Sequence, residues 1–224
     1  MAYTVNTSYR AKYYNKNTRY ISNIKYIVIH YTANSGSTAT AKGNANYFKN
    51  CPRKASAHYI VDENSTVYQC VPDINAAYAV GDSGYGSMKN IVTNGNSISI
   101  EMVSHTNSSG VYYIPESTIQ RTVELTKFLM KKYNIPVKNV YRHYDVTKKL
   151  CPAPFVNSPS QWISFKNRLT GSDEMEKQIK IKLNGKTKTV NVIEKDGYNY
   201  VKLQDLRDDK IEIGYDGLPI INSK

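Results

Sequence analysis

One of the chain's four histidines and one of its three cysteines lie together in the stretch Tyr141-Arg142-His143-Tyr144-Asp145-Val146-Thr147-Lys148-Lys149-Leu150-Cys151-Pro152. Upstream, the apolar, β-branched run Tyr26-Ile27-Val28-Ile29-His30-Tyr31 predicts a buried strand with His30 at its end, where sites are usually built. Two imidazoles and one thiolate are the ligands of a zinc site that leaves its fourth position to water. Spacing alone does not establish such a site, because a histidine at a strand end is more often an ordinary polar side chain.

Four motifs follow one another along the chain: the strand that ends at His30, Ser56-Ala57-His58-Tyr59-Ile60-Val61-Asp62, Asn96-Ser97-Ile98-Ser99-Ile100-Glu101-Met102, and the stretch from His143 to Cys151. Together they resemble the zinc-dependent N-acetylmuramoyl-L-alanine amidases, whose fold is shared with peptidoglycan recognition proteins. Within that family the chain most resembles endolysins of phages that infect clostridia. The resemblance covers roughly residues 20 to 168. It implies an α/β fold with a central mixed β-sheet flanked by helices.

The resemblance also implies the roles of five residues. His30, His143 and Cys151 would bind Zn²⁺. The family's strand glutamate falls on Glu101, which would act as the general base, and Lys149 would stabilise the oxyanion. Glu101 is the only charge in its predicted strand, where a carboxylate without a partner is costly. The alternative for this glutamate is a salt bridge, or a hydrogen bond that orients a histidine.

Three further residues are expected to contact the substrate: His58, Tyr78 and Asn96. His58 has two other interpretations, as an additional metal ligand or as a core histidine. Two positions depart from the family. Many relatives have a tyrosine where this chain has Ala57, and relatives often have a substrate-contacting histidine where it has Ala79. The first departure shifts the catalytic burden onto the glutamate, and the second puts fine substrate contacts in doubt.

Three further features are expected near the proposed site. Asp145 either accepts a hydrogen bond from a ligating imidazole or caps its own loop. Lys148 is expected to be a solvated charge. Residues 72–96 are rich in Gly, Ser and Asn, and a loop this long inside a compact domain is usually functional. We therefore expect it to form one wall of a substrate groove.

The remaining patterns predict the other elements of the larger domain. A helix beginning at Pro115-Glu116-Ser117 has an acid at its start and Lys131-Lys132 near its end, which suits the helix dipole. Its apolar face indicates core packing. That face comprises Ile119, Val123, Leu125, Phe128, Leu129 and Met130. The other expected elements are a polar arm at 1–24, a helix at 38–50, a hairpin of 57–61 with 66–71, strands at 97–103 and 140–142, and a closing helix through Trp162, Phe165 and Leu169.

The composition changes at Thr170-Gly171-Ser172-Asp173-Glu174, where we place a domain boundary. The predicted organisation is a zinc amidase catalytic domain at 1–170, a linker at 171–175 and a small β-rich domain at 176–224. In the latter, apolar residues alternate with lysines before the turn Asn184-Gly185, and Asp196-Gly197 and Asp216-Gly217 mark later turns. The stretch 196–203 resembles C-terminal modules of clostridial lysins, which implies a cell-wall-binding domain. The alternative is a structural appendage that mediates self-association.

Met175 directly follows the predicted boundary. An internal translation start there would yield the small domain alone, and the two products could assemble. Mass spectrometry of protein expressed from the intact gene tests this hypothesis, because a single full-length species would exclude it.

The chain is basic, with a net charge of +12. Residues 1–171 carry 20 Lys and Arg against 8 Asp and Glu, whereas residues 172–224 carry 10 of each. Such a surface attracts polyanions, and wall teichoic acid and nucleic acid both qualify. The 20 tyrosines suit glycan stacking and nucleobase stacking equally. Because no finger, basic zipper or RNA-recognition motif is present, we expect peptidoglycan and teichoic acid as partners rather than nucleic acid.

The cysteine count is odd, with Cys51, Cys70 and Cys151. We expect Cys51 and Cys70 to be free thiols rather than a disulfide, because the chain start suggests synthesis in a reducing cytosol. Met1-Ala2-Tyr3-Thr4-Val5-Asn6-Thr7 begins no apolar signal segment, and no run is long enough to insert into a membrane. The expected protein is made in the bacterial host cytoplasm without a signal peptide and acts on the wall after release.

The function implied is that of an endolysin, a peptidoglycan hydrolase that lyses the cell. It would cleave the amide between N-acetylmuramic acid and the L-alanine of the stem peptide with zinc-activated water. The alternative is a peptidoglycan recognition protein of the same fold that binds without cutting. Non-catalytic relatives typically lose the cysteine ligand, so the presence of Cys151 together with Lys149 favours the enzyme.

Overall fold

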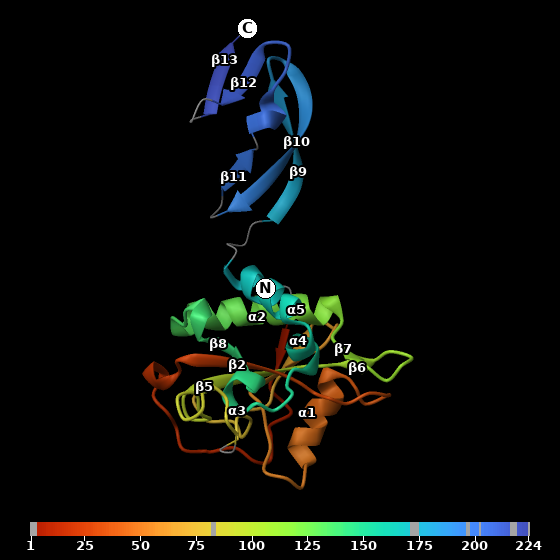
Figure 1. Ribbon diagram of the computed structural model, residues 1–224, viewed down its shortest axis with the longest axis vertical. Coiled ribbons are helices and arrows are strands. Elements are labelled where there is room, and N and C mark those ends of the chain that lie inside the picture. The colour runs from red at the N-terminus through yellow and green to blue at the C-terminus, as the bar shows by residue number, and fades with distance from the viewer. Residues whose placement is uncertain are drawn as a thin grey trace. The chain divides into compact units, whose positions relative to one another are not determined.

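The computed structural model describes residues 4–81, 84–170, 175–195, 198–201, 203–215 and 219–223 (Figure 1). The chain forms two compact units, Met1–Leu169 and Thr170–Lys224. Among the described residues, the helices are too short or too polar to cross a membrane.

The larger unit is built on a six-stranded mixed sheet, as predicted. Its strands are β1 (Thr4–Asn6), β2 (Tyr26–Tyr31), β3 (Tyr59–Val61), β4 (Thr66–Gln69), β5 (Ser97–Met102) and β8 (Val140–Arg142), in the order β1-β4-β3-β5-β2-β8. β3 and β4 form the predicted antiparallel hairpin, and the other pairs are parallel. The amino-terminal arm contributes β1 at one edge, which the sequence pattern did not predict. A small hairpin of β6 (His105–Thr106) and β7 (Tyr112–Tyr113) lies outside this sheet.

Five helices accompany the sheet among the described residues of this unit: α1 (Ala41–Asn50), α2 (Glu116–Tyr133), α3 (His143–Thr147), α4 (Ala153–Asn157) and α5 (Pro159–Thr170). Short 3₁₀ turns η1 (Ile21–Asn23) and η2 (Val137–Asn139) precede β2 and β8. The predicted helices α1, α2 and α5 are confirmed. The region after β8, expected to be a loop, instead forms α3, and its five residues are too few for a helical period to be read from the sequence.

Strand alternation divides the side chains of the sheet between two faces. On one face the core contains Ile27, Ile29, Ile98, Ile100 and Met102 from β2 and β5, with Leu125, Leu129 and Phe165 from α2 and α5. The expected apolar face of α2 is wrong in one position, because Phe128 is 36% exposed. On the other face, α1 and α3 cover the sheet (Figure 1). His30 and Glu101 belong to this second face.

The smaller unit is β-rich. β9 (Met175–Leu183), β10 (Lys186–Lys195) and β11 (Tyr198–Val201) form an antiparallel sheet in the order β11-β10-β9. Asn184 and Gly185 have φ of 51° and 79°, as a two-residue hairpin turn between β9 and β10 requires. η3 (Leu203–Leu206) and the pair β12 (Ile211–Tyr215) and β13 (Pro219–Ser223) complete the unit. The predicted turns at 196–197 and 216–217, and residues 171–174 of the predicted linker, lie outside the described residues.

A buried carboxylate joins three parts of the larger unit. Asp73 is 6% exposed and accepts hydrogen bonds from Tyr59 Oη (2.7 Å), Gln69 Nε2 (3.1 Å) and Lys132 Nζ (3.0 Å), and another from Tyr133 Oη. Burial raises the pKa of this carboxyl group, but the hydrogen bonds from Tyr133, Tyr59 and Lys132 outweigh it and hold the pKa below its usual value. Asp73 therefore ties the loop after β4 to β3 and to the end of α2.

Replacing Asp73 should destabilise the larger unit. Asp73→Ala leaves buried tyrosine hydroxyls without an acceptor, and we expect a loss of about 2–3 kcal/mol in urea unfolding at neutral pH. Because the folded pKa is depressed, the contribution of Asp73 is present above the unfolded pKa of an aspartate and is lost as the pH falls through the folded value. The difference between wild type and Asp73→Ala should therefore narrow in acid.

Glu116→Ala is the control, since it removes an exposed ion pair with Arg168. An exposed pair contributes about 1 kcal/mol or less. An Asp73→Ala variant that is no less stable than Glu116→Ala would contradict the structural role of Asp73.

Candidate metal centre

The register of two central strands places the first members of the site. β2 and β5 pair in parallel with His30 opposite Glu101, so both side chains project from the same face near the carboxyl ends of their strands. β8 pairs with β2 on its other side and leads directly into α3, whose first residue is His143. The chain returns to the same place through Cys151, whose carbonyl accepts a hydrogen bond from Tyr144 N (2.8 Å).

Three side chains of the types that bind metals converge at this edge. One ligand atom from each of His30, His143 and Cys151 lies within 4.8 Å of the others. His30 Nδ1 is 3.8 Å from Cys151 Sγ, and the two imidazole rings are 4.6 Å apart at their centroids. All three are buried, with exposures of 2%, 6% and 3%. Residues 121 positions apart in the chain therefore meet in one enclosed cluster.

The donor set fits a zinc ion. The bond lengths of a tetrahedral zinc site imply a sulfur–nitrogen separation of about 3.6 Å, close to the 3.8 Å between Cys151 Sγ and His30 Nδ1. Within the described part of the chain, His143 Nδ1 and His30 Nε2 are buried without a hydrogen-bond partner. Buried polar atoms normally have partners, and a metal ion held by His30 Nδ1 and Cys151 Sγ would supply one for His143 Nδ1.

Burial also sets the ionisation of these ligands. It lowers the pKa of His143 to about 4, and the charge of Lys149 acts in the same direction. Burial, then His143 and Lys149, hold the pKa of His30 well below its usual value. Both imidazoles are therefore neutral near pH 7, the form that ligates metals. Burial and the charge of Glu101 raise the pKa of the Cys151 thiol to about 12, and a divalent cation is the kind of charge that would stabilise its thiolate.

Glu101 lies beside this cluster without a salt bridge. Its side chain is partly exposed, yet its Oε2 atom is buried and has no hydrogen-bond partner among the described residues. Burial raises its pKa to about 8, against the opposing charge of Lys149. The salt-bridge alternative for Glu101 is therefore not supported. A carboxylate with a free, desolvated oxygen suits proton transfer.

The two adjacent lysines differ in their surroundings. The positive charge of Lys149 influences the pKa of His30, Glu101, His143 and Cys151, although its side chain is exposed. The neighbouring lysine, at 148, ends α3 with φ of 63° and lies over the Tyr144 ring at 4.6 Å. Lys149 is thus close enough for its charge to act on the site, whereas the exposed lysine at 148 fits the expected solvated charge.

Asp145 caps α3 rather than supporting a metal ligand. Its Oδ2 accepts from Arg142 N (2.8 Å), and its Oδ1 accepts from Arg142 Nη2 (2.7 Å). No hydrogen bond joins it to an imidazole among the described residues. Of the two interpretations, the structure favours the cap, which fixes the start of the helix that carries His143.

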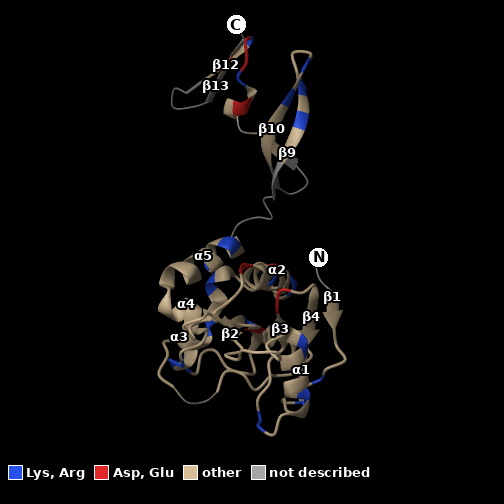
Figure 2. Cartoon of the chain, turned by 90° about the vertical axis from the view of Figure 1, so that its right-hand side faces the viewer, with Lys and Arg blue, Asp and Glu red and all other residues tan. Residues whose placement is uncertain are grey.

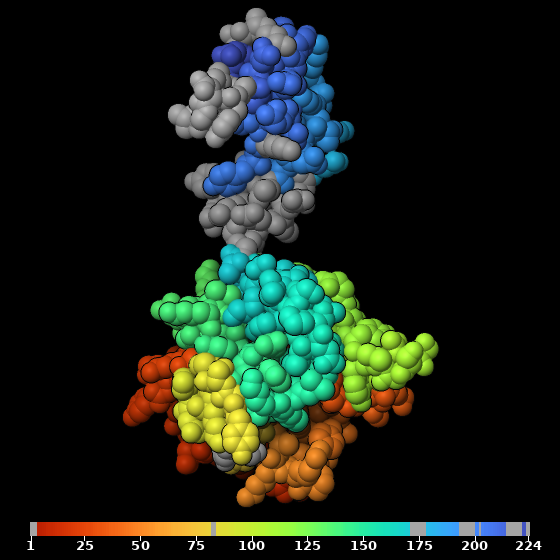
Figure 3. Space-filling view, viewed as in Figure 1, coloured from red at the N-terminus to blue at the C-terminus, as the bar shows by residue number. Residues whose placement is uncertain are grey.

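The glycine-rich loop lies against α3. Met88 N donates to Asp145 O at 3.0 Å. A Cβ atom added at Gly84 would lie 2.2 Å from Thr147 O, and one added at Gly86 would lie 2.3 Å from Asp145 O. Figure 3 shows the loop, in yellow, against the teal surface that follows β8. The sequence marked this loop as functional but did not identify its close contact with the helix that bears a ligand.

Two residues expected to contact the substrate occupy other positions. His58 is 1% exposed; its Nδ1 accepts from Ser99 N (3.0 Å), and its Nε2 lies 3.1 Å from both Arg19 Nη2 and Asn75 O. Because both ring nitrogens have partners, the structure favours the core interpretation over a metal ligand, and contact of His58 with substrate stays a prediction. Asn96 precedes β5, at the end of the strand opposite to Glu101, and bonds locally to Thr93 N and Ile91 O.

The structure also gives the surroundings of the other residues singled out in the sequence. Tyr78 is partly buried beside Ser56, and its contact with substrate stays a prediction. Ala57 is fully buried, and Ala79 packs near Val28. Cys51 and Cys70 are buried free thiols, which confirms that expectation.

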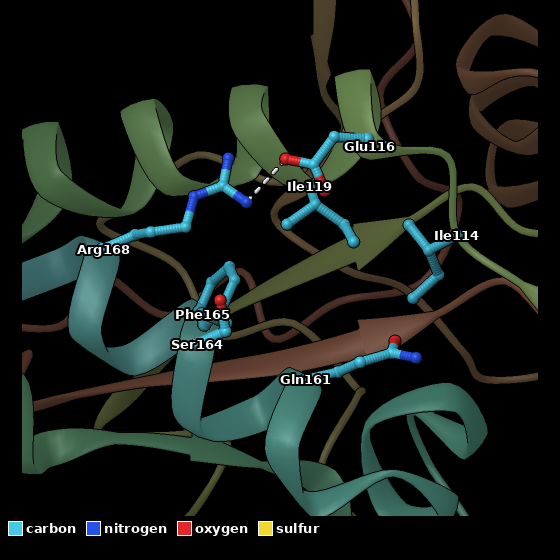
Figure 4. A pocket seen from close by; sticks show the side chains of 7 residues that line it. All are labelled: Ile114, Glu116, Ile119, Gln161, Ser164, Phe165 and Arg168. Atoms are coloured by element: carbon cyan, nitrogen blue, oxygen red, sulfur yellow. Dashed lines mark hydrogen bonds and ion pairs between the residues drawn. The ribbon is translucent and has the colours of Figure 1, made fainter. Parts of the chain in front are cut away.

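A cavity of about 280 Å³ lies elsewhere in the unit (Figure 4). It lies between α2 and α5, where Arg168 Nη1 donates to Glu116 Oε1 at 2.7 Å. Its lining residues are Ile114, Glu116, Ile119, Gln161, Ser164, Phe165 and Arg168. None of the four side chains around the candidate metal centre contributes to it, so we assign this cavity no role in the chemistry.

A methyl group at Gly86 should disturb the metal centre through α3. Gly86→Ala forces the loop or the helix to move, so we expect a stability loss of about 1–3 kcal/mol, as for an overpacked core, and weaker zinc retention. Urea unfolding and zinc content after dialysis measure the two effects. Gly95→Ala is the matched control, because the nearest atom to its added Cβ is Thr93 Oγ1 at 3.7 Å. If the two variants were equally stable and retained equal zinc, the loop would not support the metal centre through α3.

The larger unit is similar in sequence to known proteins. A family model described as N-acetylmuramoyl-L-alanine amidase matches residues 20–154. The chain is 36% identical over 156 residues to the N-acetylmuramoyl-L-alanine amidase CwlL of Bacillus licheniformis, a match that covers 66% of this chain and 41% of that protein. It is 31% identical over 177 residues to the amidase BlyA of Bacillus subtilis (strain 168), covering 75% and 44%. The match thus spans less than half the length of these two relatives.

Two solved structures share the fold. The catalytic domain of XlyA superposes with a TM-score of 0.58 at 27% identity, covering 74% of this chain and 99% of that one. A mutant endolysin from Bacillus subtilis gives a TM-score of 0.58 at 28% identity, covering 75% and 99%. Because the family model covers more than half of the sequence, the chain belongs to the N-acetylmuramoyl-L-alanine amidase family.

Proposed function

We propose that this chain is a zinc-dependent peptidoglycan hydrolase that cleaves the amide between N-acetylmuramic acid and the L-alanine of the stem peptide. One observation carries the proposal. In a chain of the amidase family, His30, His143 and Cys151 bring their ligand atoms within 4.8 Å of one another, with Glu101 opposite His30 on the neighbouring strand.

Each residue of the site has a proposed task. His30, His143 and Cys151 would hold zinc, which when bound acidifies a coordinated water and polarises a carbonyl. Glu101 would accept the proton of the attacking water on its unpartnered Oε2 and then deliver it to the leaving amine. The ammonium of Lys149 would stabilise the negative charge that develops on the carbonyl oxygen. Burial of the three ligands excludes bulk water and strengthens these interactions.

A second function, peptidoglycan recognition without cleavage, requires only a surface that binds the polymer. The full set of three donors and the unpartnered Glu101 oxygen favour cleavage, because neither is needed for binding. Digested peptidoglycan separates the two functions. We expect new L-alanine amino termini without new reducing sugars, and no products after chelation of the metal. Intact peptidoglycan after incubation with zinc-replete protein would favour recognition.

Replacing Glu101 should separate chemistry from metal binding. Glu101→Ala removes the proposed general base but none of the three donors, so we expect zinc content to be unchanged and kcat on a soluble muropeptide to fall about 10²–10⁴-fold. Turnover close to wild type would refute the assigned role of Glu101.

Replacing the sulfur ligand should remove metal and activity together. Cys151→Ser exchanges a thiolate for a poor zinc ligand, so elemental analysis should find less than stoichiometric zinc and muropeptide hydrolysis should be lost. Cys70→Ser is the control, because Cys70 is an equally buried thiol away from the cluster. Full zinc retention in Cys151→Ser would exclude the sulfur as a ligand.

We also propose that the larger unit is the catalytic domain and that residues 176–224 bind the cell wall. The β-rich smaller unit and the amidase match, which ends at residue 154, support this division. Removing residues 172–224 should weaken sedimentation with whole walls by about tenfold or more while sparing hydrolysis of a soluble muropeptide. Equal sedimentation of both forms would leave the smaller unit as an appendage, and analytical ultracentrifugation would then show whether it mediates self-association.

The likeness to an endolysin of Bacillus subtilis supports a lytic role, with synthesis in the host cytoplasm and action on the wall. We extend this proposal to a phage enzyme that acts on clostridial walls, because the stretch 196–203 resembles C-terminal modules of clostridial lysins. Zymography on clostridial and Bacillus walls tests the extension, since clearing of the Bacillus walls alone would reject it.

A further inference from the structure

The positive charge of the chain is concentrated at its beginning. The first 61 residues contain nine Lys and Arg and no Asp or Glu, against a net charge of +12 for the whole sequence. A segment of this length without a carboxylate cannot neutralise its own cations. Its surface therefore depends on neighbouring elements or on a partner for compensating charge.

The fold gathers five of these cations on one surface. The amino-terminal arm lies along the end of α1, where Lys12 N donates to Phe48 O at 2.9 Å. This contact brings the arm beside the turn that follows α1, and Figure 2 shows blue segments and no red along α1. All five cations are exposed. We call this the basic–aromatic surface, and it comprises Arg10, Lys12, Lys49, Arg53 and Lys54 with Tyr9, Tyr13 and Tyr47.

Three of the five cations contact tyrosines rather than carboxylates, and Arg10 donates to Gln69 O at 3.1 Å. Lys49 Nζ lies 5.5 Å from the centre of the Tyr9 ring, and Lys12 Nζ lies 5.2 Å from that of Tyr13. Arg53 Nη2 donates to Tyr47 Oη at 2.9 Å. Such contacts orient a cation without neutralising it, so its charge stays available to an anion.

The nearest carboxylates in the sequence are already engaged. Asp62 is 2% exposed and accepts from Ala41 N (2.7 Å), and Glu63 lies 3.0 Å from His105 Nε2. Asp73 is bound by the hydrogen bonds described above. Across the described residues, no ion pair involves any of the five cations of the basic–aromatic surface.

We propose that the basic–aromatic surface binds an anionic phosphodiester polymer of the bacterial wall, of the teichoic acid class. This inference rests on the proposed function, which brings the chain to the wall. Ammonium and guanidinium groups bind phosphate oxygens, and tyrosine rings cover the sugar or polyol between successive phosphates. A nucleic acid offers the same charge, but the sequence contains no recognition motif for it.

The surface lies apart from the metal centre. α1 begins beside Asp62, which follows β3 at the sheet edge where β2 and β5 also end. The helix then runs for ten residues to Lys49 and Asn50, a length of about 15 Å. A polymer held at the far end of α1 would therefore leave the metal centre open to a stem peptide.

Replacing cations of the basic–aromatic surface by neutral glutamine tests the inference. The variant Lys12→Gln/Lys49→Gln/Arg53→Gln removes three cations of the surface, and Lys25→Gln/Lys131→Gln/Lys138→Gln removes three exposed cations elsewhere on the same unit. Binding of each full-length protein to poly(glycerol phosphate) is measured over a range of NaCl concentrations, beside a single-stranded DNA of similar length. Hydrolysis of a soluble muropeptide is measured in parallel.

We expect the surface variant to bind poly(glycerol phosphate) about tenfold or more weakly. The slope of log K against log salt should fall by about 2, as for three lost phosphate contacts on a flexible strand. The control variant should bind like wild type, and both should hydrolyse the muropeptide normally. Equal weakening in the control would overturn the inference in favour of a general charge effect, as would tighter binding of DNA than of poly(glycerol phosphate) by wild type. A protein that binds the polymer as expected but hydrolyses no muropeptide would refute the proposed function and leave the surface assignment standing.

Discussion

Parallel pairing of β2 with β5 is the constraint on which the rest of the site depends. The register sets His30 opposite Glu101, and six residue pairs share it, from Tyr26 with Ser97 to Tyr31 with Met102. Because side chains alternate along a strand, a slip of one residue would turn Glu101 into the opposite core and bring an apolar neighbour to the site. The apolar residues of that opposite core therefore specify the geometry of the face that carries His30 and Glu101. Core packing and site geometry are two consequences of one register.

Burial has opposite effects on the two kinds of group at this edge. It keeps both imidazoles neutral, as metal binding requires, and it raises the pKa of Glu101 and of the Cys151 thiol. A divalent cation would favour both anionic forms again. The same enclosure would thus disfavour the site without metal and strengthen it with metal. The cap of α3 by Asp145 and the loop packed on that helix hold His143 in place against this cost.

Sequence patterns predicted the main elements because those elements are long and strongly periodic. The strands that carry His30 and Glu101 are apolar runs, and α2 has its charges where the helix dipole favours them. β1 and α3 were missed because neither Thr4-Val5-Asn6 nor the five residues from His143 to Thr147 carry an apolar pattern of a strand or a helix. The three donors were found through ordered motifs rather than through spacing. The sequence left the role of His58 open because its partner Arg19 lies 39 positions earlier, and no local pattern reports so distant a partner.

In the functions proposed above, the two charge patterns of the larger unit would divide its work between capture of a wall polymer and hydrolysis of the amide. A buried metal centre has to be dry and rigid, so it presents little surface with which to seize an extended polymer. Exposed cations held by tyrosine rings act over a longer range and tolerate movement of the polymer, because their attraction needs no single geometry. The sequence keeps the two groups of residues apart: nine cations and no acid precede Asp62, whereas His30 and Glu101 lie on paired strands, His143 begins α3 and Cys151 follows that helix. His30 is the exception, since it lies within the basic segment but on a buried strand. Lys149 links the two arrangements, as an exposed cation whose charge reaches the buried ligands.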